Sequence, residues 1–436
     1  MKNVEILIYK EQSVPLFPFS EPNQSVIIAK DEALIKDSTG TVLLHGNAEV
    51  RLDLLPRPRI HVLITNIEEL DDIKKFELSI RFFSGELVFL ELKNHEKHIK
   101  GFVTEWKSSN PKDPSLIFSS SSEPIFGIGN DDTHMQKIVF HLFNFKEMLA
   151  DNVIYPEHVH LEADNLVVEL KSLTESENNF KKLKNEGDYG LTHIGCFKKR
   201  DDTFISGKEA IETLHALQYF FSFAKGAWCN PVCAVGFDLS ENRVWESWSS
   251  PIYSCSQNLS QPKSWFDAYH SEQIENLFPG FMNHWNDQKW NDTFQKGIYW
   301  YLSANISRTD AGIILTQSAL ERLSYEYFKG KTGAPTDSAS ASYKLRQLFS
   351  SLNIPIDITE NTPDLKKMGD KWKWDDAPHA LTEMRNYLVH PKNKYHPEKF
   401  GPAIYDAWNL GLWYLELSLL NLCGYSETYA NRLNQR

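Results

Sequence analysis

The sequence predicts a multidomain α+β protein, in which a β-rich amino-terminal region of sandwiches or open sheets precedes an all-α carboxy-terminal bundle. Three observations predict this class. The chain has 436 residues, which is too many for one ordinary core. Short β-branched and aromatic runs, separated by turn residues, dominate its first part. Longer segments with helical spacing of apolar residues fill its last third.

The first predicted domain covers residues 1–115 and consists of short strands. Turn residues such as Ser38-Thr39-Gly40 and Ser84-Gly85 separate runs of β-branched and aromatic side chains. We expect these strands to form a sandwich or an open sheet. The runs lie at residues 4–9, 26–29, 42–45, 59–65, 76–83 and 87–92.

The second predicted domain covers residues 116–290 and mixes strands with helices. Its hairpin should turn at Ser240-Glu241-Asn242, with Trp245 and Trp248 on the return arm. If these two rings were exposed, they would suit a ligand-binding β-module. The strands are expected at residues 137–142 and 166–173, one helix at 207–226 and the hairpin at 234–250.

The third predicted domain covers residues 291–436 and is helical. A loop rich in Gly, Ser and Thr, residues 329–341, and a Pro-broken connection after residue 352 interrupt the apolar periodicity. Helices are expected at residues 297–302, 309–328, 343–352, 376–390 and 404–423.

Charge is distributed unevenly along the chain. The formal net charge is −12, which argues against a protein that coats its whole surface with cations to bind nucleic acid. Residues 291–436 hold 17 Lys and Arg against 16 Asp and Glu, whereas the first 290 residues hold 29 against 42. The most basic stretch, residues 366–399, has eight basic residues and five acidic ones.

The composition predicts a cytoplasmic protein that does not cross a membrane. No apolar run approaches the roughly 20 residues that a membrane span needs. Glu5 interrupts the first apolar stretch, which argues against a signal peptide. The five cysteines are irregularly spaced, and Cys229 and Cys233 lack zinc-ribbon spacing, so we expect reduced, buried thiols.

The stretch 376–391 contains the main candidate site. Asp376 can cap a helix whose first turn holds Pro378, and an apolar stripe through Leu381, Met384 and Leu388 should face a core. Arg385, Asn386 and His390 lie off that stripe. Pro391 disfavours helical geometry at His390, so its imidazole should lie in the last turn. A guanidinium, an amide and an imidazole at one helix end suit chemistry on a phosphate.

The run Arg385-Asn386-Tyr387-Leu388-Val389-His390 resembles the Arg-polar-x3-His ribonuclease motif of the HEPN superfamily. The segment 309–328, with Ala319-Leu320-Glu321, is similar to the long second helix of that fold, and residues 297–302 are similar to its first helix. The resemblance covers about residues 290–436. The β-rich region before it resembles the layout of ApeA-type anti-phage HEPN proteins.

This resemblance implies a metal-independent endoribonuclease without a cofactor or metal site. His390 would be the general base or acid, and Arg385 would bind the phosphate. Asn386 would orient His390 or the phosphate. HEPN ribonucleases generally form homodimers, so a homodimer through the helical domain is implied. Resemblance to anti-phage HEPN proteins further implies a toxin of abortive infection that cuts tRNA or another structured RNA after a phage-derived trigger.

Residues near the motif are candidates for binding and support. Lys371, Lys373, Lys392 and Lys394 surround it, and Trp372 offers a ring for base stacking, although it could equally be a core residue. Glu321 could anchor Arg385, but a local pair on a solvent-exposed surface explains it as well.

Other functions find weaker support. A non-catalytic module that binds nucleotide, RNA or protein remains the main alternative. Glu91-Leu92-Lys93 and Glu169-Leu170-Lys171 have the Glu-x-Lys form of magnesium nucleases, but strand alternation should place each Glu and Lys on a solvent face. His158-Val159-His160, flanked by Glu157 and Glu162, could hold a metal on one strand face, but no partner ligands from elsewhere are identifiable. Gly330-Lys331-Thr332 resembles the end of a phosphate-binding loop, but Tyr325 occupies the position of its first glycine.

Overall fold

The computed structural model divides the chain into two compact units. The first unit consists of Met1–Glu147, Asn165–Leu214 and Asn230–Leu259, and the second of Met148–Asp164, His215–Cys229 and Ser260–Arg436. The structure describes residues 15–19, 21–107, 114–121, 125–146, 148, 158–173, 176–251, 262–307, 309–336, 338–390 and 400–434. The predicted strand at residues 4–9 lies outside the described residues.

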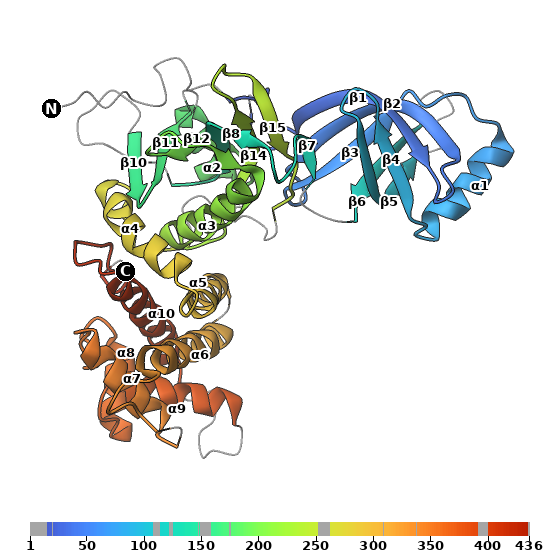
Figure 1. Ribbon diagram of the computed structural model, residues 1–436. Helices are drawn as coiled ribbons and strands as arrows, with labels where there is room; N and C mark the ends of the chain where they lie inside the picture. The colour runs from blue at the N-terminus through green and yellow to red at the C-terminus, as the bar shows by residue number, and fades with distance from the viewer. Residues whose placement is uncertain are drawn as a thin grey trace. The chain divides into compact units, whose positions relative to one another are not determined.

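A closed barrel of six antiparallel strands begins the first unit (Figure 1). The strand order β1-β2-β3-β6-β5-β4 brings β4 back to β1, so that the barrel has no unpaired edge. The sequence predicted a sandwich or an open sheet here, and it was wrong because local patterns do not show which strands pair at closure. The strands are β1 (Val26–Lys36), β2 (Val42–Asp53), β3 (Arg59–Thr65), β4 (Val88–Leu92), β5 (Lys97–Lys107) and β6 (Ser115–Ser120).

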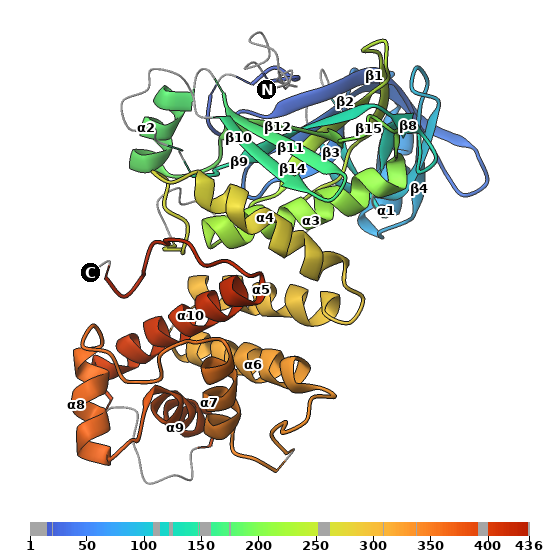
Figure 2. The same cartoon turned by 60° about the vertical axis from the view of Figure 1, so that its left-hand side comes forward.

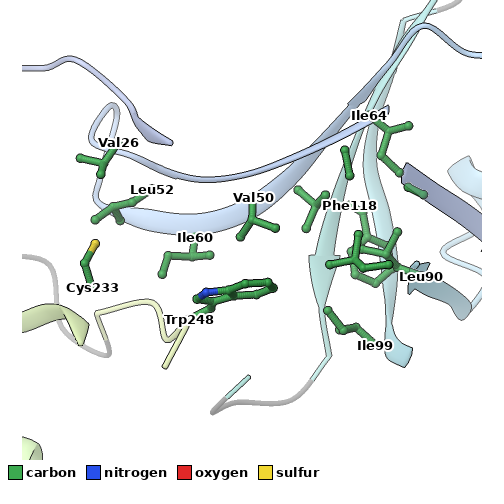
Figure 3. Close-up of a cluster of buried hydrophobic side chains, with 14 of the residues drawn as sticks. Val26, Val50, Leu52, Ile60, Ile64, Leu90, Ile99, Phe118, Cys233 and Trp248 are labelled. Atoms are coloured by element: carbon green, nitrogen blue, oxygen red, sulfur yellow. The ribbon is translucent and has the colours of Figure 1, made fainter. Parts of the chain in front are cut away.

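A mixed core of aliphatic and aromatic side chains fills the first unit. In β4, Val88, Leu90 and Leu92 are buried and alternate with half-buried residues, as a strand with one inward face requires. Trp248 lies beside Val50 and Ile60 in the same core (Figure 3). Trp245 and Trp248 are only 0% and 1% exposed, so the expectation that they line a surface ligand site is wrong.

A second, open sheet completes the first unit. Six of its strands lie in this unit in the order β11-β12-β9-β14-β15-β7, and all their described pairings are antiparallel. The strands are β7 (Phe126–Ile128), β9 (Lys137–Phe143), β11 (Leu166–Ser172), β12 (Leu191–Lys199), β14 (Pro231–Phe237) and β15 (Arg243–Ser247). A small ladder of β8 (His134–Met135) and β13 (Ile205–Ser206) accompanies them. So do α2 (Ser176–Glu186) and the first part of α3 (Gly207–Lys225), whose residues from His215 onward belong to the second unit.

Residues 76–83, predicted as a strand, belong to a helix, α1 (Asp72–Phe83). The side chain of Asp71 caps this helix by accepting a hydrogen bond from the Lys74 amide at 2.7 Å. Leu78 and Phe82, one turn apart, are its buried residues, and the Phe82 ring meets Trp106 at 5.7 Å. The apolar alternation that suggested a strand therefore belongs to a helix with a buried face.

The second unit contains the helical carboxy-terminal region that the sequence predicts. Helices α5, α6 and α10 lie side by side (Figure 2). Gly411 of α10 allows close approach to α6, because a Cβ there would lie 2.7 Å from Thr316 Oγ1. The elements are β10 (His158–Ala163), α4 (Glu272–Asn286), α5 (Asn291–Ile306), α6 (Thr309–Phe328), α7 (Ala341–Ser351), α8 (Pro363–Trp372), α9 (Ala377–Val389) and α10 (Ala403–Leu422).

The predicted helices in this unit are confirmed, four of them with shifts of at most two residues at an end, whereas the one expected at 297–302 is the much longer α5. The segment predicted at 309–328 is α6, and the one at 404–423 is α10. The segment expected as a Pro-broken connection contains α8, and α4 was not expected. No helix in the described part of the chain has both the length and the apolar composition for crossing a bilayer.

A buried ionic cluster joins the end of the chain to α5 and α10. Arg432 donates from Nε and Nη2 to the two carboxylate oxygens of Glu416, at 2.8 and 2.5 Å. Tyr301 donates to Glu416 at 2.6 Å, and Arg432 also donates to Asn305 at 3.2 Å. Burial alone would lower the pKa of Arg432, but the adjacent Glu416 carboxylate raises it above its usual value.

Candidate functional site at the end of helix α9

Helix α9 forms where local signals in the sequence predict it. The carboxylate of Asp376 accepts a hydrogen bond from the His379 amide at 2.9 Å and also pairs with the Arg346 guanidinium, which fixes the start of the helix. Pro378 lies in the first turn. Leu381 and Met384 are buried as expected, whereas Leu388 is half-buried. The predicted cap is therefore confirmed, and so is the inward position of two of the three stripe residues.

The opposite end of α9 brings Arg385, Asn386 and His390 within five residues of one another. Arg385 and Asn386 are half-buried, and Nη1 of Arg385 donates to Asn386 Oδ1 at 3.2 Å. His390 is exposed at the helix end, and its amide donates to the Asn386 carbonyl at 2.8 Å. The buried Nε of Arg385 has no hydrogen-bond partner among the described residues. The helix end therefore presents an exposed imidazole, and the guanidinium one turn earlier is held by Asn386.

Helix α6 contacts the middle of α9 through a glutamine. Gln317 Nε2 donates to Thr382 Oγ1 of α9 at 3.4 Å and to Glu321 Oε1 at 3.1 Å. In the part of the chain that the structure describes, no ion pair joins Glu321 to Arg385, so Glu321 is linked to α9 through Gln317. Gln317 and Thr382 were not singled out from the sequence, because only the tertiary packing of α6 on α9 places them together.

A cavity of about 590 Å³ lies along the Glu321 side of α6. Glu321, Arg322 and Lys329 line it together with Tyr325, which is exposed. The Arg322 guanidinium is held by Asp292, so its charge is partly neutralised within the protein. Gln317 therefore links Thr382, in the middle of α9, to Glu321 in the lining of this cavity.

The structure describes three of the five predicted RNA-binding residues. Lys371 and Lys373 are exposed at the end of α8. Trp372 is half-buried among rings, with its centroid 6.4 Å from that of Trp374 and 6.5 Å from that of Phe400. Lys392 and Lys394 lie outside the described residues. Trp372 can therefore offer only part of its surface to a base.

The two Glu-x-Lys patterns, considered as alternative metal-nuclease sites, contain residues that are paired locally or buried. Glu91 pairs with Lys36, and Lys93 donates to Glu32 at 2.7 Å, so both Glu91 and Lys93 form local pairs across strands. Glu169 is only 1% exposed, which makes the expectation of a solvent face wrong for this residue. Strand β11 is buried on both sides, and strict alternation does not expose every second residue in such a strand.

In the third pattern, His160 Nε2 lies 2.9 Å from Glu162 Oε1 and forms a local pair with this carboxylate. Among the described residues, no group of three or more His, Cys, Asp or Glu side chains has the arrangement of a metal site.

Two family models match the chain. Residues 130–259 match the YopA central domain, and residues 287–436 match the YopA C-terminal domain. Over 261 residues the chain is 29% identical to the SPbeta prophage-derived uncharacterized protein YopA of Bacillus subtilis (strain 168). That alignment covers 58% of this chain and 57% of the relative, so this chain spans just over half of the relative's length. No solved structure matches the chain.

Proposed function

We propose that the chain is an endoribonuclease of HEPN type that cuts RNA without a metal ion, using the end of α9. The observation that supports this most is the exposed His390 one turn from the Arg385–Asn386 pair. RNA supplies its own nucleophile, the 2′-hydroxyl, so the protein need only move protons and stabilise the pentavalent phosphate. His390 would move the proton, and the fork of Arg385 would hold the non-bridging oxygens.

A second copy of the chain would complete such a site. Five residues along a helix separate two side chains by about 140° around the axis and roughly 7.5 Å along it. Arg385 and His390 of one helix therefore face apart. A homodimer through the helical region would place His390 of one copy near Arg385 of the other. Lys371, Lys373, Trp372, Lys392 and Lys394 would then hold the RNA on either side.

The biological setting is part of the same proposal. The prophage origin of the YopA relative supports a role in phage infection, which is where abortive-infection ribonucleases act. The chain would act in the cytoplasm on tRNA or another structured RNA after a phage-derived trigger. The acidic first 290 residues would sense that trigger or restrain the helical region, a hypothesis motivated by their 42 acidic against 29 basic residues.

Cleavage of total tRNA in EDTA tests the proposal. The full chain is compared with Arg385→Ala, His390→Ala and the matched control His379→Ala, which lies at the other end of the same helix. We expect cleavage that survives chelation, leaves 2′,3′-cyclic phosphate ends and falls by at least about a hundredfold in the two site variants only. Equal cleavage by all four proteins would refute the site.

A non-catalytic binding module is the second candidate. The half-buried guanidinium of Arg385, hydrogen-bonded to its own helix neighbour, favours it because a structural arginine has the same environment. The module would bind RNA, nucleotide or protein with the same surface. His390→Ala separates the candidates, since a binding module would lose affinity for RNA in a filter-binding assay and would have no cleavage to lose.

A further inference from the structure

A second cavity, of about 790 Å³, lies where several helices of the second unit end. Its size is typical of sites that enclose an organic ligand. Residues from the end of α4 and the following turn, the end of α6, the residue after α7 and the end of α10 line it. The cavity is separate from Arg385, Asn386 and His390, none of which lines it.

The lining is cationic although the chain is acidic. Lys289, Lys329 and Lys331 line the cavity against one acid, Glu326. Lys329 pairs with Glu326 at 3.2 Å, so these two charges offset each other. Lys289 and Lys331 form no ion pair with a carboxylate in the part of the chain that the structure describes. Two ammonium groups are therefore available to an anion.

Aromatic rings and helix ends supply the other contacts. The ring of Trp290 is half-buried and meets His284 at 5.4 Å, which leaves it partly open to the cavity. Lys331 Nζ lies 3.4 Å from the centroid of Tyr327, which holds this ammonium at the cavity. Several carbonyls at these helix ends already accept one backbone hydrogen bond, as Phe328 does from Lys331 and Asn421 does from Gly424. A carbonyl oxygen has a second lone pair, which can accept from a hydroxyl or amino group.

We infer that this cavity binds a nucleotide. Phosphate oxygens would pair with Lys289 and Lys331, the base would stack on Trp290, and sugar hydroxyls or base amino groups would donate to the helix-end carbonyls. The carboxyl ends of helices carry partial negative charge, which disfavours a bare anion. A ligand with phosphate oxygens for the two lysines and hydrogen-bond donors for the helix-end carbonyls fits both parts of the lining. The nucleotide could be free or part of an RNA strand, since both present the same groups.

Calorimetric titration of the full chain tests this assignment. The probes are ATP, GTP, CTP, UTP, pyrophosphate and octauridylate, and the protein contains His390→Ala so that no RNA is cut. We expect at least one nucleotide to bind, and Lys289→Glu/Lys331→Glu to weaken it by at least about tenfold. The matched control Lys367→Glu, an exposed lysine of α8, should leave the affinity unchanged.

The outcomes distinguish a free nucleotide from an RNA strand, and some of them would overturn the inference. Binding of a triphosphate but not of octauridylate assigns a free nucleotide, whereas binding of octauridylate that the double substitution weakens assigns an RNA strand. Absence of binding by every probe at millimolar concentration, or equal affinity of the double variant, would overturn the inference. Pyrophosphate that binds as tightly as ATP would overturn base recognition. None of these results bears on cleavage, which rests on α9.

Discussion

Glu416 shows how one buried charge can determine the stability of the helical unit. Its side chain is fully buried, and Arg432 and Tyr301 satisfy its oxygens. A buried carboxylate without its cation is strongly destabilising, whereas a buried pair replaced by apolar groups of similar volume is often neutral. The sequence contained a hint of this pair, because Glu416 is one of two acids in the long apolar segment 404–423.

We therefore expect Arg432→Met to lower the free energy of unfolding by about 3–5 kcal/mol, because it leaves the Glu416 carboxylate uncompensated. The double variant Arg432→Met/Glu416→Leu should recover most of that loss. Urea denaturation followed by circular dichroism measures both. If the double variant were as unstable as the single one, packing of the Arg432 side chain, and not its charge, would explain the effect.

Asp53 should make the first unit sensitive to acid. Burial alone would raise its pKa, but His61, whose Nε2 lies 3.0 Å from Oδ2, and Ser25, which donates to Oδ1 at 2.6 Å, lower the pKa to about 2. A carboxyl with a depressed folded-state pKa stabilises the fold above its unfolded value of 3.8 and loses this contribution as pH falls toward 2.

The corresponding contribution is about 2 kcal/mol at neutral pH. We expect unfolding by urea at pH 6, 4 and 2.5 to show this loss in the parent chain. Asp53→Asn should be less stable at pH 6 and should show a flatter dependence below pH 4. An unchanged slope in the variant would mean that other carboxylates determine the acid sensitivity.

Helices α1 and α8 show why secondary structure was only partly predictable. In α1, apolar residues at 76, 78, 80 and 82 alternate as they would in a strand, and the cap from Asp71 was overlooked. In α8, the cap comes from another element, because Asp406 of α10 accepts hydrogen bonds from the amides of Asp364 and Leu365 at 2.9 and 3.2 Å. Such a cap is absent from the local sequence, whereas α9 has its own cap and was predicted.

The two faces of α1 give a matched test of its orientation. Phe82 is 4% exposed and packs on Trp106, whereas the adjacent Phe83 is 80% exposed. Phe82→Ala should lower the free energy of unfolding by about 3–5 kcal/mol, and Phe83→Ala should change it by less than about 0.5 kcal/mol. Thermal and urea denaturation of both variants checks this. Similar losses in the two variants would contradict a helix with Phe82 inside.

At the scale of the whole molecule, the sequence predicted the type and position of many helices and strands well, but it predicted poorly which of them pair or pack together. Strand β3 and helix α6 begin and end where local patterns place them. Barrel closure, the burial of Trp245 and Trp248, and the contact of Gln317 with Thr382 depend on segments far apart in the chain. The placement of Arg385, Asn386 and His390 at one helix end was predictable from local patterns, as β3 was, because the three residues are close in the sequence. The division of the chain at residues 115 and 290 stays a prediction.

The second unit also contains residues before 290 on which its helices depend. Asn305 Nδ2 donates to the carbonyls of Gly226 and Lys263 at 2.9 and 2.8 Å, and Arg432 donates to the same Lys263 carbonyl at 3.1 Å. The ring of Phe281 in α4 lies 5.2 Å from that of Phe294 in α5. Each buried donor left without an acceptor destabilises a fold by about 1–3 kcal/mol.

We therefore expect the fragment 291–436 to unfold at a lower urea concentration than the helical unit of the full chain, with weaker near-ultraviolet circular dichroism. The fragment 215–436 keeps both carbonyls and α4, and it should recover most of the stability. Equal stability of the two fragments would show that these contacts are dispensable. If the shorter fragment is unstable, absence of RNA cleavage by it would report unfolding. The proposed regulatory role of residues 1–290 is therefore tested with substitutions in the full chain.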